Sequence, residues 1–266
     1  MKMRISNSLI HQFHTKGYAI CENVLSQTEI KLLRDECDVL VNFVYNDRDL
    51  LCDMGCVIET LSCGYFDAPD DKDYKTNRDT YVNMRSQINR DVISLLLGKI
   101  PAIAKQFLLF ENVYLFNEQY IVKPPRSSQA QFAWHQDSEY MDNISSVVPS
   151  ISCWIALDDV DENNGTLFIE PYVSEYSEDV TPNNLDEYSQ FHRGLAKLYP
   201  PITDAQSSSQ VTVRIQAGSI VFMSGYVRHR SIGNSTSKFR RVFMPQYSAG
   251  VVKSPKGGPL ALAIAC

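Results

Sequence analysis

The chain has 266 residues, of which 44% are hydrophobic and 21% are charged, so it is long enough to bury a sizeable core and has an ordinary globular composition. Its net charge of −6 and the lack of a lysine or arginine run exclude the electrostatic footprint of a nucleic-acid-binding protein. The sequence carries no signal-peptide pattern and no apolar stretch of membrane-spanning length, and we expect a cytoplasmic protein whose seven cysteines are free thiols.

The first hundred or so residues are patterned mainly as helices. A short apolar helical face ends at Gly17, and residues 18–25 follow as a short strand. Ser26 and Glu29 form a capping-box signature before an amphipathic helix that runs to about residue 44.

The next part of the chain alternates between irregular and helical patterns. Residues 46–80 lack periodicity, and we expect a long irregular segment there. Helical spacing returns over residues 89–110, where Pro101 is expected to divide the helix into two pieces.

From about residue 112 the pattern changes to short strands bounded by Pro, Gly, Asp or Asn. The strand candidates are residues 112–125, 131–137, 150–160, 165–171, 211–215, 218–223, 226–232 and 239–248. Helices followed by strands without βαβ alternation predict an α+β fold with a mainly β core, built as a helix-supported antiparallel barrel or double sheet. We predict one domain over 1–266, with helical support mainly in 1–110 and the barrel mainly in 112–250.

Two polar residues, His135 and Asp137, lie two positions apart in the apolar stretch WHQDSEY. Alternate residues of a strand project from one face, so both side chains are expected to point into the same interior. A hydrogen-bonded couple at a strand end and a pair of metal ligands both explain this motif, and the motif alone leaves both open.

A third ligand is available on a distant strand candidate. Of the five histidines, two belong to the first helix and His192 lies in an irregular stretch, which leaves His229. A sheet that closes on itself can bring His229 beside the other two side chains. Two histidines and one carboxylate leave three coordination positions open, as in non-haem Fe(II) oxygenases.

An iron site of this kind that uses 2-oxoglutarate needs an anchor for the distal carboxylate, because an unpaired charge is costly inside a barrel. Arg240 lies on the next strand candidate after His229, and a guanidinium binds a carboxylate through two parallel hydrogen bonds. Strand alternation places its neighbour Arg241 on the other face.

In their order and spacing, several short motifs make the chain resemble the phytanoyl-CoA dioxygenase (PhyH) family of Fe(II)/2-oxoglutarate oxygenases over nearly its whole length. The motifs are F-x-x-x-G-Y at Phe13 to Tyr18, IVKPP at Ile121 to Pro125, WHQD at Trp134 to Asp137, WIALDDVDENNGTLFIEP at Trp154 to Pro171, and H-x-S-x-x-N with a later arginine at His229, Ser231, Asn234 and Arg240. The resemblance implies a double-stranded β-helix (jelly-roll, cupin-like) barrel. The chain departs from the family after Pro171, where the family commonly continues with glycine, serine and histidine.

The resemblance also implies roles for single residues. The implied iron ligands and catalytic residues are His135, Asp137 and His229. The implied contacts to 2-oxoglutarate are Arg240, Ser231, Trp154 and Gln119. A core anchor equally explains Trp154, and an ordinary strand position equally explains Gln119. Tyr140 and Met141 are candidates for lining a substrate pocket.

The implied cofactors are Fe(II), the cosubstrates 2-oxoglutarate and O2, and ascorbate as a supporting reductant. The implied reaction oxidises a C–H bond of a small-molecule metabolite or natural product by hydroxylation, desaturation or cyclisation, with release of succinate and CO2. Asp137 disfavours halogenation, because related halogenases replace this carboxylate with a small residue. We expect neither a nucleic-acid nor a membrane partner.

Three alternatives stay open. One is a catalytically silent binding protein with the same fold, another is an acyl-CoA hydroxylase, and the last is a zinc hydrolase that uses the same three ligands. The acidic residues 67–73 and the negative net charge give a CoA substrate little support. Residues 158–162 have the composition of a solvated turn, and residues 46–80 and 172–209 are hypotheses for lids that determine the substrate.

Overall fold

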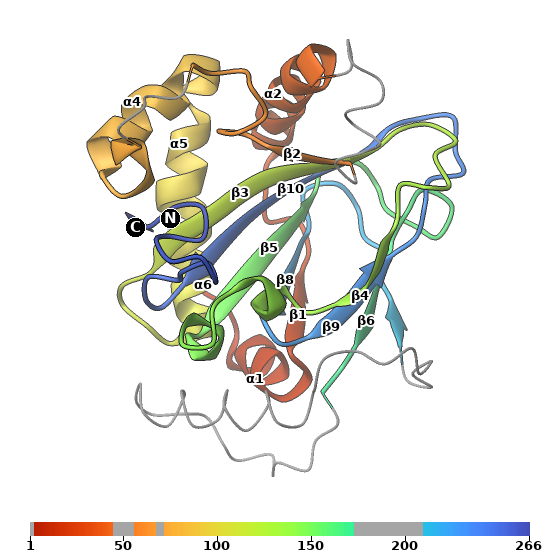
Figure 1. The fold of residues 1–266 in the computed structure, drawn as a ribbon. Helices are drawn as coiled ribbons and strands as arrows, with labels where there is room; N and C mark the ends of the chain where they lie inside the picture. Colours follow the sequence, from red (N-terminus) through yellow and green to blue (C-terminus); the bar gives the residue numbers. More distant parts are fainter. Residues whose placement is uncertain (1–2, 45–55, 68–71, 173–209) are drawn as a thin grey trace.

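The computed structural model describes residues 3–44, 56–67, 72–172 and 210–266, and most of its helices precede most of its strands (Figure 1). The helices are α1 (Asn7–Lys16), α2 (Gln27–Val44), α4 (Arg78–Asn89), α5 (Val92–Ser94) and α6 (Ile100–Leu108), with a π-helical turn at Leu95–Lys99 and 3-10 turns η1 (Asp73–Lys75), η3 (Asp137–Tyr140) and η4 (Ser145–Val147). The strands are β1 (Tyr18–Cys21), β2 (Val57–Glu59), β3 (Tyr114–Lys123), β4 (Phe132–His135), β5 (Ser150–Ala156), β6 (Leu167–Glu170), β7 (Val211–Thr212), β8 (Ile220–Ser224), β9 (Arg228–Ser231), β10 (Arg240–Ser248) and β11 (Ile264–Ala265). Among the described residues, no helix is long and apolar enough to cross a membrane.

The strands form two antiparallel sheets. The larger has the order β1-β8-β5-β10-β3-β11, with β2 paired to β3, and the smaller has the order β4-β9-β6-β7. In Figure 1 the smaller sheet lies opposite the larger one, on the side away from α4, α5 and α6. The mainly β core with helical support is the architecture that the sequence pattern predicts.

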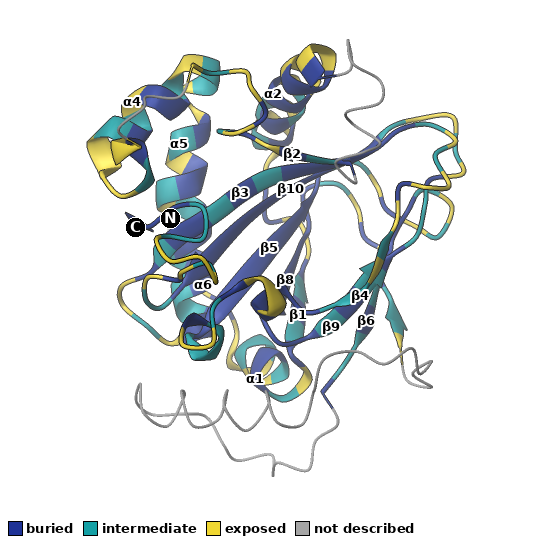
Figure 2. Ribbon diagram, viewed as in Figure 1, coloured by how far each residue is buried: buried dark blue, intermediate teal, exposed yellow. Residues whose placement is uncertain are grey.

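Strand alternation gives the larger sheet two different faces. Along β10, Phe243 and Tyr247 pack into the apolar core that the helices share with this sheet. Arg240, Met244 and Gln246 project from the other face and line a cavity between the two sheets. Figure 2 shows β5, β8 and β10 buried along almost their whole length, because helices cover one face and the smaller sheet stands over the other.

The start of α2 and the end of α1 lie at the residues that the sequence predicts. The backbone N–H of Ser26 donates to Glu29 Oε2 at 2.7 Å, and that of Glu29 donates to Ser26 Oγ at 3.3 Å, which completes the capping box of α2. Gly17 ends α1 with φ of 79°, and a Cβ at this position would lie 2.6 Å from Cζ of Tyr172. Gly17 therefore caps the helix and also leaves room for the ring of Tyr172. Tyr172 follows Pro171, the point where the chain departs from the family pattern.

The prediction that residues 46–80 form one irregular segment is wrong at two places that the structure describes. Residues 57–59 form β2, whose three residues are too few to show a period and are held by pairing with β3. Helix α4 already begins at Arg78, after Asn77 caps it by accepting from the N–H groups of the next turn.

The predicted break at Pro101 is also wrong. The chain passes from α5 through the π-helical turn into α6 without interruption, and Pro101 lies in the first turn of α6. Proline has no N–H and its ring crowds the preceding turn, so the wider π turn before it lets the helix continue.

A buried ion network ties α2 and α4 to the helix-facing side of β3. Arg85 contacts Glu36 at 2.5 Å and Glu118 at 2.9 Å, and all three side chains are almost completely shielded from solvent. The hydroxyls of Tyr81 and Tyr120 donate to Glu118 and Glu36 at 2.8 and 2.7 Å. Burial raises the pKa of the Glu118 carboxyl, and the neighbouring Glu36 carboxylate, which shares the Arg85 guanidinium, raises it further.

Replacing this guanidinium is expected to destabilise the fold. Arg85→Met leaves two buried carboxylates without their cation, and the free energy of unfolding in urea should fall by about 3–5 kcal/mol. Lys31→Met is the matched control, because Lys31 forms an exposed ion pair with Asp35, and its loss should stay below about 1 kcal/mol. Equal losses for the two variants would contradict a structural role for the buried network.

Candidate active site

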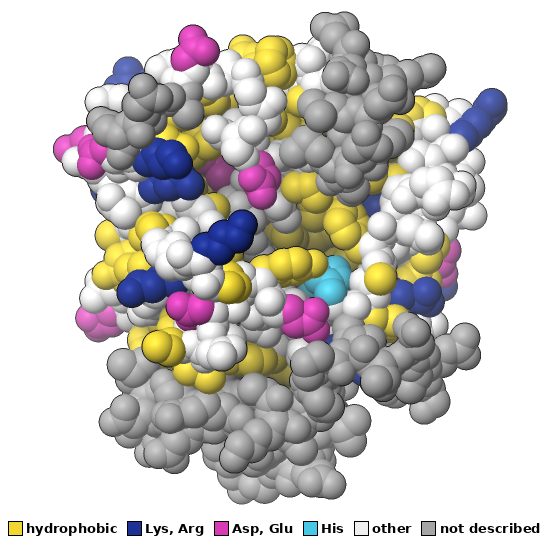
Figure 3. Space-filling model, viewed as in Figure 1, with side chains coloured by type: hydrophobic (Ala, Val, Ile, Leu, Met, Phe, Trp, Pro, Cys, Tyr) yellow, Lys and Arg dark blue, Asp and Glu magenta, His cyan; other side chains and the backbone are white. Residues whose placement is uncertain are grey.

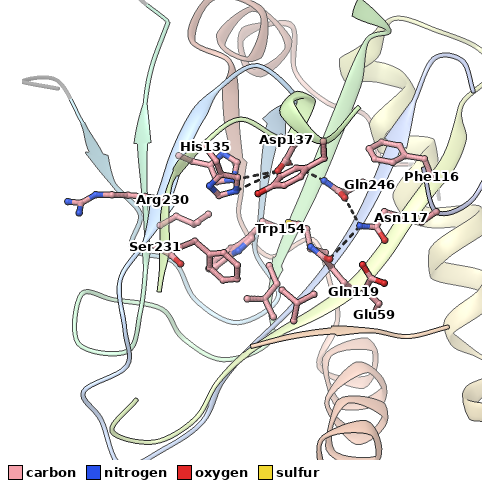
Figure 4. A pocket seen from close by; sticks show the side chains of 18 of the residues that line it. Glu59, Phe116, Asn117, Gln119, His135, Asp137, Trp154, Arg230, Ser231 and Gln246 are labelled. Atoms are coloured by element: carbon pink, nitrogen blue, oxygen red, sulfur yellow. Dashed lines mark hydrogen bonds and ion pairs between the residues drawn. The ribbon is translucent and has the colours of Figure 1, made fainter. Parts of the chain in front are cut away.

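Three predicted ligand side chains meet between the two sheets (Figure 4). The antiparallel register of β4 and β9 places His135 opposite His229, with ring centroids 4.2 Å apart. Nε2 of each histidine lies 3.8 Å from Oδ1 of Asp137. One ligand atom from each side chain lies within 4.8 Å of the other two, so the three donors can share one metal ion.

The expectation that His135 and Asp137 project from one strand face is wrong in its geometry. Strand β4 ends at His135, and Asp137 begins the 3-10 turn η3. The N–H of Ser138 donates to the carbonyl of Gly225 at 2.9 Å, which fixes this turn against the β8–β9 connection. The turn, rather than strand alternation, brings the Asp137 carboxylate to the histidines.

Both histidines are held in the tautomer that a metal ligand requires. Nδ1 of His135 lies 2.8 Å from the carbonyl of Ala133, and Nδ1 of His229 lies 3.1 Å from the carbonyl of Val227. A carbonyl only accepts, so Nδ1 carries the proton and Nε2 keeps its lone pair for the metal. Burial, together with the nearby His135, lowers the pKa of His229 to about 4 and keeps its imidazole neutral.

Asp137 is held through one of its two oxygens. Ser152 Oγ donates to Oδ2, and Gln246 Nε2 donates to the same oxygen at 3.1 Å. Gln246 also donates to Ser152 Oγ at 2.7 Å, so the two side chains brace one another. Oδ1 is thereby left facing the histidines as the third ligand atom.

Removing this brace is expected to weaken metal binding without removing a ligand. Gln246→Leu should lower Fe(II) affinity roughly 10–100-fold in anaerobic calorimetric titrations, because an unbraced carboxylate samples unproductive orientations. Gln119→Leu is the control, since Gln119 lines the same cavity without contacting Asp137, and its metal affinity should be unchanged. Equal Fe(II) affinities for Gln246→Leu and the unmodified protein would contradict the proposal that Gln246 holds Asp137 in place.

The metal-ligand group opens on a cavity of about 550 Å³. Figure 3 shows the hollow on this face, with hydrophobic side chains around it and a histidine at its edge. Gln119 on β3 and Trp154 on β5 both line the cavity, and Trp154 is only 2% exposed. Tyr140 lies at its margin, whereas Met141 packs into a separate small core with Phe116.

Arg240 brings a buried positive charge to this cavity. It is fully shielded, its Nη1 donates to the carbonyl of Ile121 at 3.3 Å, and its guanidinium lies 5.4 Å from the centre of the Trp154 ring. Among the described residues, Nε and Nη2 have no hydrogen-bond partner. Burial lowers the pKa of Arg240 to about 10, which still leaves it charged at neutral pH, so an anion beside it would be stabilised.

Lys123, which the sequence analysis did not assign, lies beside this arginine. The antiparallel register pairs Lys123 with Arg240, and its Nζ donates to Ser231 Oγ at 2.6 Å and to the carbonyl of Ile232. Burial and the charge of Arg240 lower the pKa of Lys123 to about 6. A Cβ at Gly165 would lie 2.5 Å from Lys123 Cδ, so this glycine leaves room for the lysine stem.

The predicted separation of Arg240 from Arg241 is confirmed. Arg241 projects from the opposite face of β10 and contacts Asp158 at 2.9 Å and Asp38 at 2.7 Å.

The expectation that the acidic turn is solvated is wrong for Asp158, whose side chain is 19% exposed. The predicted lid over 172–209 lies outside the described residues except for Tyr172, and so do residues 46–55 and 68–71 of the predicted lid over 46–80.

A family model described as phytanoyl-CoA dioxygenase (PhyH) matches residues 13–242. The chain belongs to this family. The match begins within α1 and ends within β10, includes the three metal-ligand candidates, and agrees with the resemblance seen in the sequence motifs.

Curated relatives are about a quarter identical to this PhyH-family chain over the residues that align. It is 26% identical to the peroxisomal phytanoyl-CoA dioxygenase of Rattus norvegicus over 160 residues, which is 58% of this chain and 45% of that protein. It is 23% identical to the phytanoyl-CoA dioxygenase of Arabidopsis thaliana, over 91% of this chain and 87% of that protein. The chain thus spans less than half the length of the rat relative.

Solved structures share the fold of this PhyH-family chain. The non-heme alpha ketoglutarate dependent carbocyclase SnoK from nogalamycin biosynthesis has a TM-score of 0.58 at 16% identity, over 94% of this chain and 87% of that chain. The epimerase SnoN, solved in complex with Fe3+, alpha ketoglutarate and nogalamycin RO, has a TM-score of 0.58 at 16% identity, over 93% and 84%. The likeness confirms the predicted double-stranded β-helix fold.

Proposed function

We propose that the protein is an Fe(II)- and 2-oxoglutarate-dependent dioxygenase that oxidises a C–H bond of a small molecule. One observation carries this proposal: the His135, Asp137 and His229 donors converge in the same cavity as the buried, incompletely bonded guanidinium of Arg240. A zinc hydrolase would use the three ligands but leave the guanidinium without an anion. The SnoN complex, which contains Fe3+ and alpha ketoglutarate in a protein of this fold, supports the same two groups here.

The donor set suits the proposed metal. Two neutral imidazoles and one carboxylate are the ligands of facial Fe(II) sites, and they leave positions for a chelating cosubstrate and O2. When bound, iron with 2-oxoglutarate and O2 supplies the oxidation: one oxygen atom enters the substrate as a hydroxyl, the other enters succinate, and CO2 leaves. Desaturation or ring closure would instead remove two hydrogens from two different atoms of the substrate, and the second oxygen atom would leave as water.

The chain's own residues would position the reactants and exclude water. Arg240 would bind the distal carboxylate of 2-oxoglutarate through its free Nε and Nη2, with the Trp154 ring against its guanidinium. Ser231 and Gln119 are further proposed contacts, and Lys123 holds the Ser231 hydroxyl in place. Ser152 and Gln246 would keep Asp137 turned toward the metal.

The test is a turnover assay on the purified protein with Fe(II), ascorbate and 2-oxoglutarate in the presence of metabolite extracts. We expect succinate release together with a metabolite that gains one oxygen or loses two hydrogens, both absent from a control without 2-oxoglutarate. Succinate at the control level across a broad substrate panel would instead favour the silent binding protein.

A further inference from the structure

The cavity carries opposite polarities at its two ends. Arg240, the first residue of β10, supplies positive charge at one end, whereas a carboxylate and three carboxamides lie further along β10, on the adjacent β3, and on β2, which pairs with β3. Figure 4 shows these four groups together. These groups belong to Glu59, Asn117, Gln119 and Gln246.

Arg230 does not change this polarity. It is the other arginine among the described lining residues, which include no lysine. Its guanidinium lies 5.3 Å from the ring centre of Trp134 and 4.6 Å from that of Phe168, and Figure 4 shows it pointing away from the cavity.

Glu59 determines the net charge of the cavity once Fe(II) and 2-oxoglutarate are bound. With Fe(II) and 2-oxoglutarate bound, the charges of the metal, Asp137, the cosubstrate and Arg240 cancel one another. Because Arg230 points away from the cavity, Glu59 then remains as the uncompensated charge among the described lining residues that face it. A substrate with a positive group would neutralise it, and a substrate with a negative group would be repelled.

Glu59 is fixed in place but keeps a free oxygen. It is the last residue of β2 and pairs with Gln119 of β3, and its carbonyl accepts from the backbone N–H groups of Ser62 and Cys63 at 3.1 and 2.9 Å. Ser62 Oγ donates to Oε2, which leaves Oε1 for a ligand. Glu59 is exposed, so a cation paired with it would keep part of its contact with water, while Leu260 and Met244 of the same cavity would pack against the apolar part of the ligand.

Asn117 provides a second acceptor close to this carboxylate. Its Nδ2 donates to Gln246 Oε1 at 2.9 Å, and Gln246 in turn donates to Asp137. The donor side of the Asn117 amide is thereby occupied, and its Oδ1 is left to accept. An ammonium group has three donors and no acceptor, so it matches a carboxylate oxygen and an amide oxygen better than a hydroxyl does.

We infer that the substrate is a small molecule with an apolar body and a protonated amine that pairs with Glu59 and Asn117, an inference that rests on the proposed function. The amine would hold the far end of the substrate while the apolar body, packed against the cavity wall, presents a C–H bond to the metal. Glu59 is thus the residue that selects the substrate by charge.

A lysine side chain near Glu59 provides the alternative to this inference. Lys75 borders an adjoining hollow of about 140 Å³ that Glu59 and Asn117 also line. The described Lys75 and Glu59 side chains form no ion pair with each other. If Lys75 rather than Glu59 set the preference, the cavity would select carboxylates.

The inference can be tested with three probes that share one ring and differ in charge: cyclohexylamine, cyclohexanol and cyclohexanecarboxylate. Each is titrated calorimetrically, without O2, into protein loaded with Fe(II) and 2-oxoglutarate at pH 7, where an aliphatic amine with a pKa of about 10.4 is protonated. We expect the amine to bind about fivefold more tightly than the alcohol, a difference of about 1 kcal/mol, and the carboxylate to bind most weakly.

Variants assign the preference to one residue. Glu59→Gln should bring the amine to the affinity of the alcohol while 2-oxoglutarate still binds, which also reports that the variant is folded. Glu111→Gln, at an exposed carboxylate outside the cavity, should keep the fivefold preference.

Three results would overturn the inference: no binding of the amine, equal binding of the three probes, or an amine preference that survives in Glu59→Gln. Failure of the unmodified protein to bind 2-oxoglutarate would instead contradict the proposed function itself.

Discussion

Replacing His135 with alanine is expected to abolish 2-oxoglutarate turnover, with succinate release falling to the level of a control without protein. The substitution removes one of three ligands, and the remaining His229 and Asp137 donors cannot hold the metal at the same affinity. Loss of a ligand should exceed the roughly 10–100-fold loss of metal affinity that follows loss of a supporting group. Metal content after dialysis and succinate release measure the two effects separately.

The control for this variant is His11→Ala. His11 is an exposed histidine on α1, so its replacement should leave both metal content and turnover unchanged. Retention of iron by His135→Ala, or an equal loss in both variants, would show that the metal binds somewhere else.

Arg240→Gln is expected to raise the KM for 2-oxoglutarate about 100-fold or more. Breaking a buried, hydrogen-bonded charge pair costs about 3–5 kcal/mol, and each 1.4 kcal/mol is a factor of ten in affinity. The kcat at saturating 2-oxoglutarate should fall much less, because Arg240 lies away from the metal ligands. Arg240→Lys keeps the charge but loses the bidentate contact, so its KM for 2-oxoglutarate should lie between those of the unmodified protein and Arg240→Gln. Initial rates of succinate release over a range of 2-oxoglutarate concentrations give both constants.

Arg241→Gln is the matched control on the opposite face of β10. Its ion pairs with Asp158 and Asp38 contribute to stability, so it should lower the unfolding temperature while the KM stays at the unmodified value. 2-Oxoglutarate should also raise the unfolding temperature of the unmodified protein and of Arg241→Gln, but not that of Arg240→Gln. Normal turnover by Arg240→Gln with no requirement for 2-oxoglutarate would support the zinc hydrolase.

The sequence pattern predicted the parts of the fold that depend on local periodicity. The apolar positions of α2 that recur at a spacing of three and four residues are buried, as that spacing predicts: Ile30, Leu33, Cys37, Leu40 and Val44. Glu36 is buried on the same helix, but nothing local indicates this, because its partners Arg85 and Tyr120 come from remote segments. Burial of a charged residue depends on tertiary neighbours that a periodic pattern does not contain.

The site was predictable to the extent that its residues carry a motif. His135, Asp137 and His229 could be proposed from spacing, strand placement and the family resemblance. Glu59 and Gln246 could not, because a polar residue within a strand gains its role only from the register of its neighbours. Gln246 interrupts the apolar run of β10, and that interruption is the one local signal of its inward contact with Asp137.

The most direct measurement is a crystal structure of the protein prepared without O2 in Fe(II) and 2-oxoglutarate, with anomalous scattering recorded at the iron edge. We expect a single iron peak within bonding distance of Nε2 of His135, Nε2 of His229 and Oδ1 of Asp137, and the distal carboxylate of 2-oxoglutarate on the Arg240 guanidinium. An iron peak away from these three atoms, or 2-oxoglutarate bound without contact to Arg240, would contradict the proposed site.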